Sequence, residues 1–249
     1  MSDEIRKDFV KDHDMATKEN KRIRVDYQMF RWGPLLVKFK IPDDIRKKLL
    51  SEAHASSKDF EKNLAGVITK EVGFRDIDMF KPFFHTIFEI YADAQLKWAP
   101  EVGATRDHFK QQYLIEALWA NFQGPGDFNP PHDHGGTLSW VIFLQMPKEL
   151  IEEKNKYKGR SAGPGGLTFI YGEGPRSYIS HHSFFPEEGD MFIFPATLKH
   201  WVFPFKSDCV RISVSGNVND SIKWKDLKKI KEVKKDEQKN DTSNNKQTV

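Results

Sequence analysis

The chain has 249 residues, enough for one large domain with a real core, and its 20 Phe and 6 Trp mean that rings supply much of the buried area. The formal net charge of +3 is small and reflects a lysine-rich C-terminal end, so a nucleic-acid partner is permitted but not indicated. A single cysteine, Cys209, excludes an internal disulfide framework and favours a reducing compartment. The charged N-terminus lacks the apolar run of a signal peptide, and no stretch of about 18 apolar residues occurs, so we expect a soluble cytoplasmic protein.

The N-terminal residues are predicted to lie outside the core. Residues 1–22 are highly charged, and we expect a loosely held arm or one short helix there. Residues 23–30 and 35–41 are rich in β-branched and aromatic side chains and are separated by a Gly-Pro pair. Such segments on either side of a turn predict two strands.

Two helices are predicted next. Pro42-Asp43-Asp44 is typical of a helix start, with a carboxylate available as the N-cap. Residues 77–98 carry a wide aromatic face at helical spacing, which must lie against something large, most simply a sheet. Residues 23–110 are therefore predicted to form a support layer of strands and helices.

From residue 111 the periodicity changes to that of strands. Six short segments rich in β-formers are each bounded by Gly, Pro or Asp. They are residues 111–123, 137–146, 166–171, 190–194, 199–205 and 209–214. Short strands without intervening helices indicate an antiparallel sandwich or barrel. We predict a mainly β chain with a β-core over residues 111–218 and the N-terminal helices packed on one of its faces.

Two polar segments accompany this core. The stretch from Pro147 to Pro164 is predicted to be a long loop, either a lid over a substrate or a solvated connector. Residues 219–249 combine dense charge with few apolar side chains, which predicts a frayed helix followed by disorder.

His132 and His134 begin the most specific chemical pattern in the sequence. Residues two apart in a strand point to the same face, so both imidazoles are predicted to meet at one point while Asp133 points away. Imidazole binds iron, zinc, copper and nickel alike, so the pair does not name the metal. A surface turn that happens to hold two histidines is the alternative.

A second group follows downstream. His200 lies at a predicted strand end, and ten residues separate it from Arg211, with Ser213 on the same face of the Arg211 strand. A guanidinium binds a carboxylate through two parallel hydrogen bonds, and a serine hydroxyl adds another. The alternative for Arg211 is a structural salt bridge. Of the tandem His181 and His182, at most one points inward, because adjacent strand residues face opposite ways.

This pattern resembles the iron(II)- and 2-oxoglutarate-dependent oxygenases. In that family, whose core is a double-stranded β-helix (a cupin-like jelly roll), a His-x-Asp/Glu pair and a distal His bind iron, and an Arg-x-Ser holds the far carboxylate of 2-oxoglutarate. The chain is most similar to a group from bacteriophages and marine bacteria that has a His-x-His motif. The resemblance covers about residues 112–218 and rests on Trp119-Ala120-Asn121, residues 129–136, Leu138-Ser139-Trp140 and residues 211–217.

The resemblance implies which residues bind the cofactors. His132, His134 and His200 are expected to hold iron(II), and 2-oxoglutarate and O2 are the expected co-substrates, giving succinate and CO2 as a substrate C–H bond is hydroxylated. The resemblance also implies that Asn121 lines the 2-oxoglutarate pocket together with Arg211 and Ser213.

The sequence departs from the family at one ligand. His134 stands where most members have a carboxylate, and three neutral ligands leave more positive charge on the metal. Asp133 would take over as a ligand if the chain formed a turn there instead of a strand.

Two other functions remain open. One is a non-catalytic or zinc-binding β-domain, and the other is a three-histidine cupin-type dioxygenase or isomerase without 2-oxoglutarate, which Arg211 and Ser213 disfavour. The expected partners are 2-oxoglutarate and an unidentified substrate, for which a peptidyl or prolyl side chain is favoured by analogy alone. No membrane or nucleic-acid partner is indicated, and the oligomeric state stays open. The expected location is the cytoplasm, which includes the cytoplasm of a virus-infected bacterial host.

Overall fold

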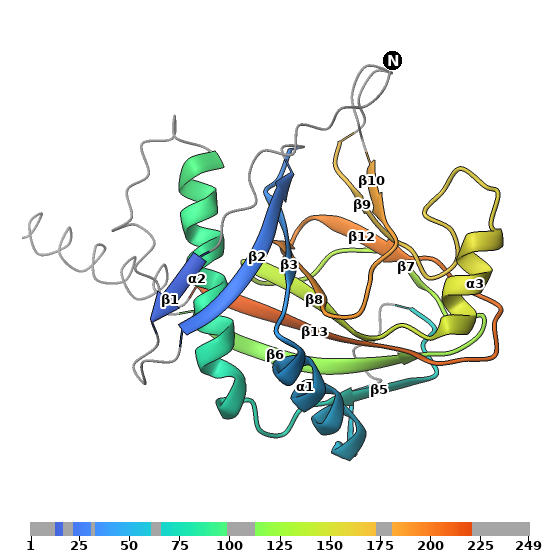
Figure 1. Ribbon diagram of the computed structural model, residues 1–249, viewed down its shortest axis with the longest axis horizontal. Coiled ribbons are helices and arrows are strands. Elements are labelled where there is room, and N and C mark those ends of the chain that lie inside the picture. The colour runs from blue at the N-terminus through green and yellow to red at the C-terminus, as the bar shows by residue number, and fades with distance from the viewer. Residues whose placement is uncertain are drawn as a thin grey trace, which may run out of the picture.

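The computed structural model describes residues 13–16, 22–30, 33–60, 66–98, 113–172 and 181–220, and these residues form two antiparallel sheets (Figure 1). The larger sheet has the strand order β1-β2-β3-β11-β8-β13-β6-β5-β4. Its strands are β1 (His13–Ala16), β2 (Arg22–Phe30), β3 (Leu36–Lys40), β4 (Lys58–Asp59), β5 (Lys70–Gly73), β6 (Tyr113–Gln123), β8 (Leu138–Gln145), β11 (Asp190–Pro195) and β13 (Arg211–Asp220). The smaller sheet has the order β10-β9-β12-β7, from β7 (Asn129–His132), β9 (Leu167–Ile170), β10 (His181–Phe184) and β12 (Lys199–Val202).

The core is a jelly roll, as predicted. From β6 to β13 the chain passes repeatedly between the two sheets, and the strands β11-β8-β13-β6 face the four strands of the smaller sheet. An aromatic cluster fills the space between them: Phe169 of β9 lies 6.0 Å from Phe192 of β11, measured between ring centroids. We call this side of each sheet the inner face. The buried phenylalanines of this cluster therefore join the two sheets; they are Phe143, Phe169, Phe192, Phe194 and Phe205.

Helices cover the outer face of the larger sheet. The short 3-10 helix η2 (Asp78–Phe80) leads into α2 (Lys81–Trp98), which buries its aromatic face against the sheet. The Phe84 ring lies 5.1 Å from the Trp140 ring of β8. The other helix on this face is α1 (Asp43–Ala55), which buries Leu49 and Ala53. The prediction of an aromatic helix packed on a sheet is confirmed.

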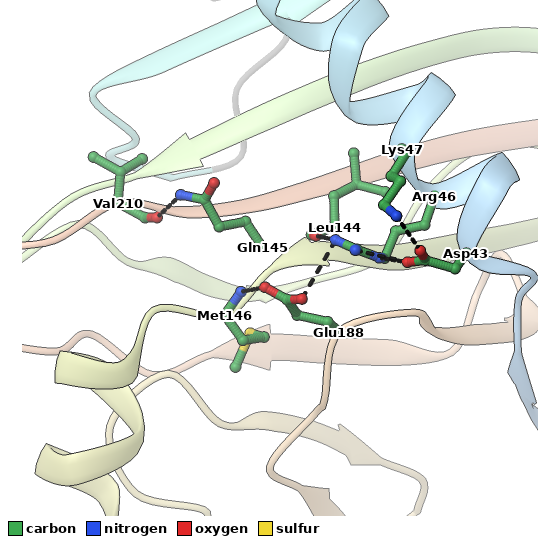
Figure 2. Close-up of polar contacts among 8 residues, drawn as sticks. All are labelled: Asp43, Arg46, Lys47, Leu144, Gln145, Met146, Glu188 and Val210. Atoms are coloured by element: carbon green, nitrogen blue, oxygen red, sulfur yellow. Dashed lines mark hydrogen bonds and ion pairs between the residues drawn. The ribbon is translucent and has the colours of Figure 1, made fainter.

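The N-cap prediction for α1 is wrong. Pro42 is the N-cap, and no side chain caps the helix. Asp43 lies in the first turn, where its carboxylate pairs with Arg46 and Lys47 one turn later (Figure 2). Arg46 also donates from Nη1 to the backbone oxygen of Leu144 at 2.7 Å, and this hydrogen bond attaches the start of α1 to β8.

Two other predictions are corrected by the structure. The polar stretch expected to be a loop contains α3 (Lys148–Lys156), which buries Leu150 in the inner cluster and uses Glu153 to accept hydrogen bonds from Lys206 and Ser207. The N-terminal arm contains β1, paired with β2. In α3, contacts with residues distant in sequence override the local polar composition, whereas β1 is held by the neighbouring strand β2. The last strand extends to Asp220, and the predicted disordered tail otherwise lies outside the described residues.

None of the helices in the described part of the chain is both long and apolar enough to pass through a membrane.

Candidate metal centre

Three histidines converge between the sheets. One ligand atom from each of His132, His134 and His200 lies within 4.8 Å of the others. His132 ends β7 and is directly paired with His200 of β12, and the centroids of these two rings are 4.4 Å apart. The His134 ring lies 4.9 Å from His132 and 5.1 Å from His200, again between centroids. Such a group of nitrogen atoms has the spacing that one divalent ion requires.

The convergence of His134 has a different cause from the one predicted. The strand β7 ends at His132, so His134 lies in the turn that follows, where its backbone N–H donates to the oxygen of Ala196 at 2.9 Å. Gly136 completes the turn with φ +95°, and a Cβ atom there would meet the backbone oxygen of Val218 at 2.9 Å. Only glycine adopts this conformation at little cost. Asp133 is exposed and lies outside the cluster even though the chain turns.

Backbone carbonyls orient two of the imidazoles. His132 Nδ1 lies 2.7 Å from the oxygen of Pro130, and His200 Nδ1 lies 3.0 Å from the oxygen of Leu198. A carbonyl only accepts, so each Nδ1 carries the proton and each Nε2 keeps its lone pair. This arrangement is common in metal-binding histidines, because the second hydrogen bond sets the tautomer and the ring direction.

Burial keeps the three imidazoles neutral. Desolvation, with the nearby His132 as a second cause, lowers the pKa of His134 to about 4. Desolvation also lowers the pKa of His132, and it holds the pKa of His200 well below the ordinary value. A metal binds the neutral form of histidine, so the cluster is in the ligating state at neutral pH.

Arg211 is a buried cation on the same inner face. It is 3% exposed, its guanidinium lies 5.1 Å from the centroid of the Phe143 ring, and its Nη1 donates to the oxygen of Gly165 at 3.0 Å. Burial lowers the pKa of Arg211 to about 9, which leaves it charged at neutral pH. Its Nε is buried without a hydrogen-bond partner. None of the ion pairs among the described residues involves Arg211, so the alternative of a structural salt bridge finds no partner there.

Ser213 and Asn121 lie beside Arg211. They are directly opposite one another on β13 and β6, and Ser213 is 3% exposed. Asn121 donates from Nδ2 to Ser215 Oγ at 3.4 Å, while its Oδ1 is buried without a partner. Paired residues of antiparallel strands share a face, so all three predicted anion-binding residues lie on the inner face of the larger sheet. A bound polar ligand would satisfy the unpaired atoms.

Two further polar residues near the histidines and Arg211, Asn129 and Gln123, were not singled out from the sequence. Asn129 places its Nδ2 3.5 Å from His132 Nε2. Gln123 is directly opposite Arg211. The period of two along β6 would have found Gln123, which lies two residues after Asn121 on the same strand. Asn129 lies three residues before His132 on β7, so the period would not have found it.

The adjacent histidines His181 and His182 of β10 point to opposite faces of the strand, as predicted. His181 is exposed, whereas His182 is half-buried and its ring lies 4.6 Å from Phe184 of the inner cluster. His182 is paired with Phe169, which is paired in turn with His200. His182 therefore lies in the same cross-strand row as the metal-ligand candidates, two strands from His200.

Part of the chain matches the model of one protein family. Residues 117–217 match the family model described as putative 2OG-Fe(II) oxygenase. No curated protein matches the sequence. All six predicted site residues lie within the matched range.

Solved structures similar to this chain share low sequence identity with it. A Pseudomonas putida prolyl-4-hydroxylase is 16% identical over 72% of this chain and 88% of its own, with a TM-score of 0.42. A 2OG-Fe(II) oxygenase family oxidoreductase from Burkholderia pseudomallei is 12% identical over 78% and 84%, with a TM-score of 0.45. HygX from Streptomyces hygroscopicus, with nickel and 2-oxoglutarate bound, is 12% identical over 76% and 84%, with a TM-score of 0.40.

Proposed function

We propose that the chain is an iron(II)- and 2-oxoglutarate-dependent oxygenase in which His132, His134 and His200 hold the iron, because the three histidines converge within residues 117–217, the range that matches the putative 2OG-Fe(II) oxygenase model. We propose further that Arg211, Ser213 and Asn121 hold 2-oxoglutarate. The enzyme then hydroxylates a C–H bond of a substrate still to be identified. The observation that carries this proposal is the buried guanidinium of Arg211, which has no ion pair among the described residues and a free Nε, on the inner face that also carries the histidine cluster.

The cofactors supply the oxidation: one O2 converts 2-oxoglutarate to succinate and CO2 and delivers its other oxygen atom to the substrate C–H bond. The protein supplies binding and orientation. Each histidine offers a neutral nitrogen, and the carbonyls of Pro130 and Leu198 hold two of the rings in the required tautomer.

Arg211 neutralises the carboxylate of 2-oxoglutarate that is remote from the metal. A guanidinium in a water-poor site binds a carboxylate strongly because few waters compete, and the Phe143 ring, 5.1 Å from the Arg211 guanidinium, supplies apolar surroundings. Ser213 adds a hydroxyl donor, and Asn121 an amide, from the neighbouring positions. An enzyme that used no 2-oxoglutarate would have no need for this buried cation.

The three-histidine ligand set has a charge consequence. Histidine ligands are neutral, so the iron keeps its full double charge, whereas a carboxylate would offset part of it. The metal should therefore attract an anionic co-substrate strongly but be held less tightly by the protein alone.

Anaerobic titration of the iron(II)-loaded protein with 2-oxoglutarate tests the proposal. The expected result is the visible charge-transfer band of a chelated 2-oxo acid. Arg211→Ala should weaken 2-oxoglutarate binding by about 10- to 100-fold, since a hydrogen-bonded pair with a charged group contributes about 1.5 to 3 kcal/mol. Absence of the band in the wild-type protein would rule out the oxygenase assignment, and wild-type affinity in Arg211→Ala would rule out the clamp.

The substrate class is proposed by analogy with the resembling family. Peptidyl side chains, prolyl included, are the first class to test, by incubating peptides with the enzyme, iron(II), 2-oxoglutarate and 18O2. A product carrying one labelled oxygen atom would support this class. Steady conversion of 2-oxoglutarate on another substrate, with no labelled peptide, would exclude it.

A further inference from the structure

Gln123 is a buried amide beside the proposed 2-oxoglutarate clamp. It is fully buried on β6, directly opposite Arg211 on β13. Its Nε2 donates to the backbone oxygen of Asp127 at 2.7 Å and faces the oxygen of Phe203 at 3.4 Å. Both are acceptors, so they determine which end of the amide is the nitrogen. The remaining atom, Oε1, is buried and has no hydrogen-bond partner.

Backbone hydrogen bonds join Gln123 to Arg211. The oxygen of Phe203, which faces Gln123 Nε2, also accepts from the backbone N–H of Gly165 at 3.2 Å. The oxygen of the same Gly165 accepts from Arg211 Nη1 at 3.0 Å. The amide and the guanidinium are thus held by two backbone segments, at Phe203 and at Gly165, that are hydrogen-bonded to each other.

The unpaired atoms of the two side chains are complementary. Gln123 has a free acceptor, Oε1, and Arg211 has a free donor, Nε–H. The two atoms are not bonded to each other in this structure. Side chains of directly opposite residues start about 5 Å apart, a separation that two long side chains can span. A carboxylate of 2-oxoglutarate cannot be the partner of Oε1, because two acceptors repel. The unpaired donor that remains for Oε1 at this site is the Nε–H of Arg211.

We propose that Gln123 is a positioning residue for the Arg211 clamp: its Oε1 accepts from Nε–H in the 2-oxoglutarate complex and fixes the plane of the guanidinium. This inference rests on the proposed function. With Nε bound to Gln123 and one Nη1 hydrogen bound to Gly165, the free hydrogens are the remaining one on Nη1 and both on Nη2. These form the end-on fork that binds a carboxylate through two parallel bonds.

The consequence is selectivity among 2-oxo acids. 2-Oxoglutarate has a second carboxylate for the fork, whereas 2-oxobutyrate keeps the chelating 2-oxo carboxylate and lacks the second one. A residue that orients the fork should affect binding of the first compound and not of the second. A residue that only stabilises the fold should affect both compounds alike or neither.

The experiment measures the dissociation constants of both compounds by anaerobic titration of the iron(II)-loaded wild-type protein, Gln123→Met and Gln123→Glu. Methionine keeps a similar length but cannot accept from Nε–H, and we expect about a tenfold loss of 2-oxoglutarate affinity, the size of one hydrogen bond to a charged group. Binding of 2-oxobutyrate should change less than about twofold, a difference too small to indicate a lost hydrogen bond. Gln123→Glu places a carboxylate against the guanidinium, competes with the co-substrate, and should lower the preference for 2-oxoglutarate further.

Gln145→Met is the matched control. Gln145 also donates from Nε2 to a backbone oxygen, that of Val210 at 2.9 Å (Figure 2), but it is only half-buried, at the end of β8. This variant should keep the wild-type preference for 2-oxoglutarate. An unchanged preference in both Gln123 variants would overturn the inference while leaving the oxygenase standing. No band for either compound in the wild-type protein would instead remove the proposed function and this inference with it.

Discussion

His132 and His200 are directly opposite one another on β7 and β12, with ring centroids 4.4 Å apart. Opposite residues of antiparallel strands present their side chains to the same face, so one strand pair supplies two ligand candidates without any help from a loop. His134 then needs only a turn to reach them. A pair on a sheet also makes the site rigid, which favours precise metal geometry.

The first prediction concerns the buried ligand candidate, His200. His200→Ala should weaken Co(II) or Fe(II) binding by more than about 100-fold, since even residues that only support a metal ligand contribute 10- to 100-fold. Calorimetric titration with the metal measures the effect. The matched control is His85→Ala, because His85 is exposed on α2 with only Glu89 nearby, at 3.7 Å. Equal affinities for the two variants would contradict the assignment.

A second prediction concerns His134, which stands where most iron(II)- and 2-oxoglutarate-dependent oxygenases have a carboxylate. His134→Asp should retain metal binding because aspartate is also a ligand, and the added negative charge offsets part of the metal charge. His134→Leu should lose metal binding, since leucine offers no ligand atom. Metal content after dialysis distinguishes the two variants. Loss of the metal from both would mean that the position demands the length of a histidine.

The third prediction is the pH range of metal uptake. A histidine with an ordinary pKa of about 6.5 becomes protonated below that pH and then cannot bind a metal. Burial lowers the pKa of His134 to about 4 and holds the pKa of His200 well below its ordinary value, so these neutral ligands should persist well below pH 6.5. Co(II) absorption should therefore stay nearly constant between pH 7 and pH 6 and fall only nearer the lowered pKa values. Circular dichroism over the same range shows whether the fold is retained. A steep loss of affinity already between pH 7 and pH 6 would refute the prediction.

A fourth prediction concerns the attachment of α3. Glu153 accepts hydrogen bonds from the backbone N–H of Lys206 and of Ser207 and from Ser207 Oγ. Glu153→Ala leaves these donors without their acceptor and should lower the free energy of unfolding by about 1 to 2 kcal/mol. Chemical denaturation measures the loss, and Glu152→Ala, on the exposed side of α3, serves as the control. Equal stabilities would show that water replaces the carboxylate at no cost.

The prediction of an antiparallel sandwich or barrel succeeded because its information is local, whereas the jelly roll itself was what the family resemblance implied. Alternating apolar residues, Gly and Pro boundaries and the aromatic face of residues 77–98 each indicate what a segment buries, and burial largely decides how segments layer. The placement of Arg211 and Ser213 on one face follows from the same period of two, whereas that of Asn121 depends on the register between β6 and β13. The α3 prediction failed because the helix depends on contacts of Leu150 and Glu153 with segments far away in sequence.

The residues themselves thus specified the kinds of chemistry available: imidazoles for a metal, a guanidinium with a hydroxyl for an anion, and strands to carry them. The three-dimensional packing decided which of these groups meet. It placed His134 by a turn instead of a strand, left Asp133 outside, turned His182 rather than His181 inward, and set Gln123 opposite Arg211. These outcomes depend on the register between strands distant in the chain, and register is a property of pairs of segments that no single segment encodes.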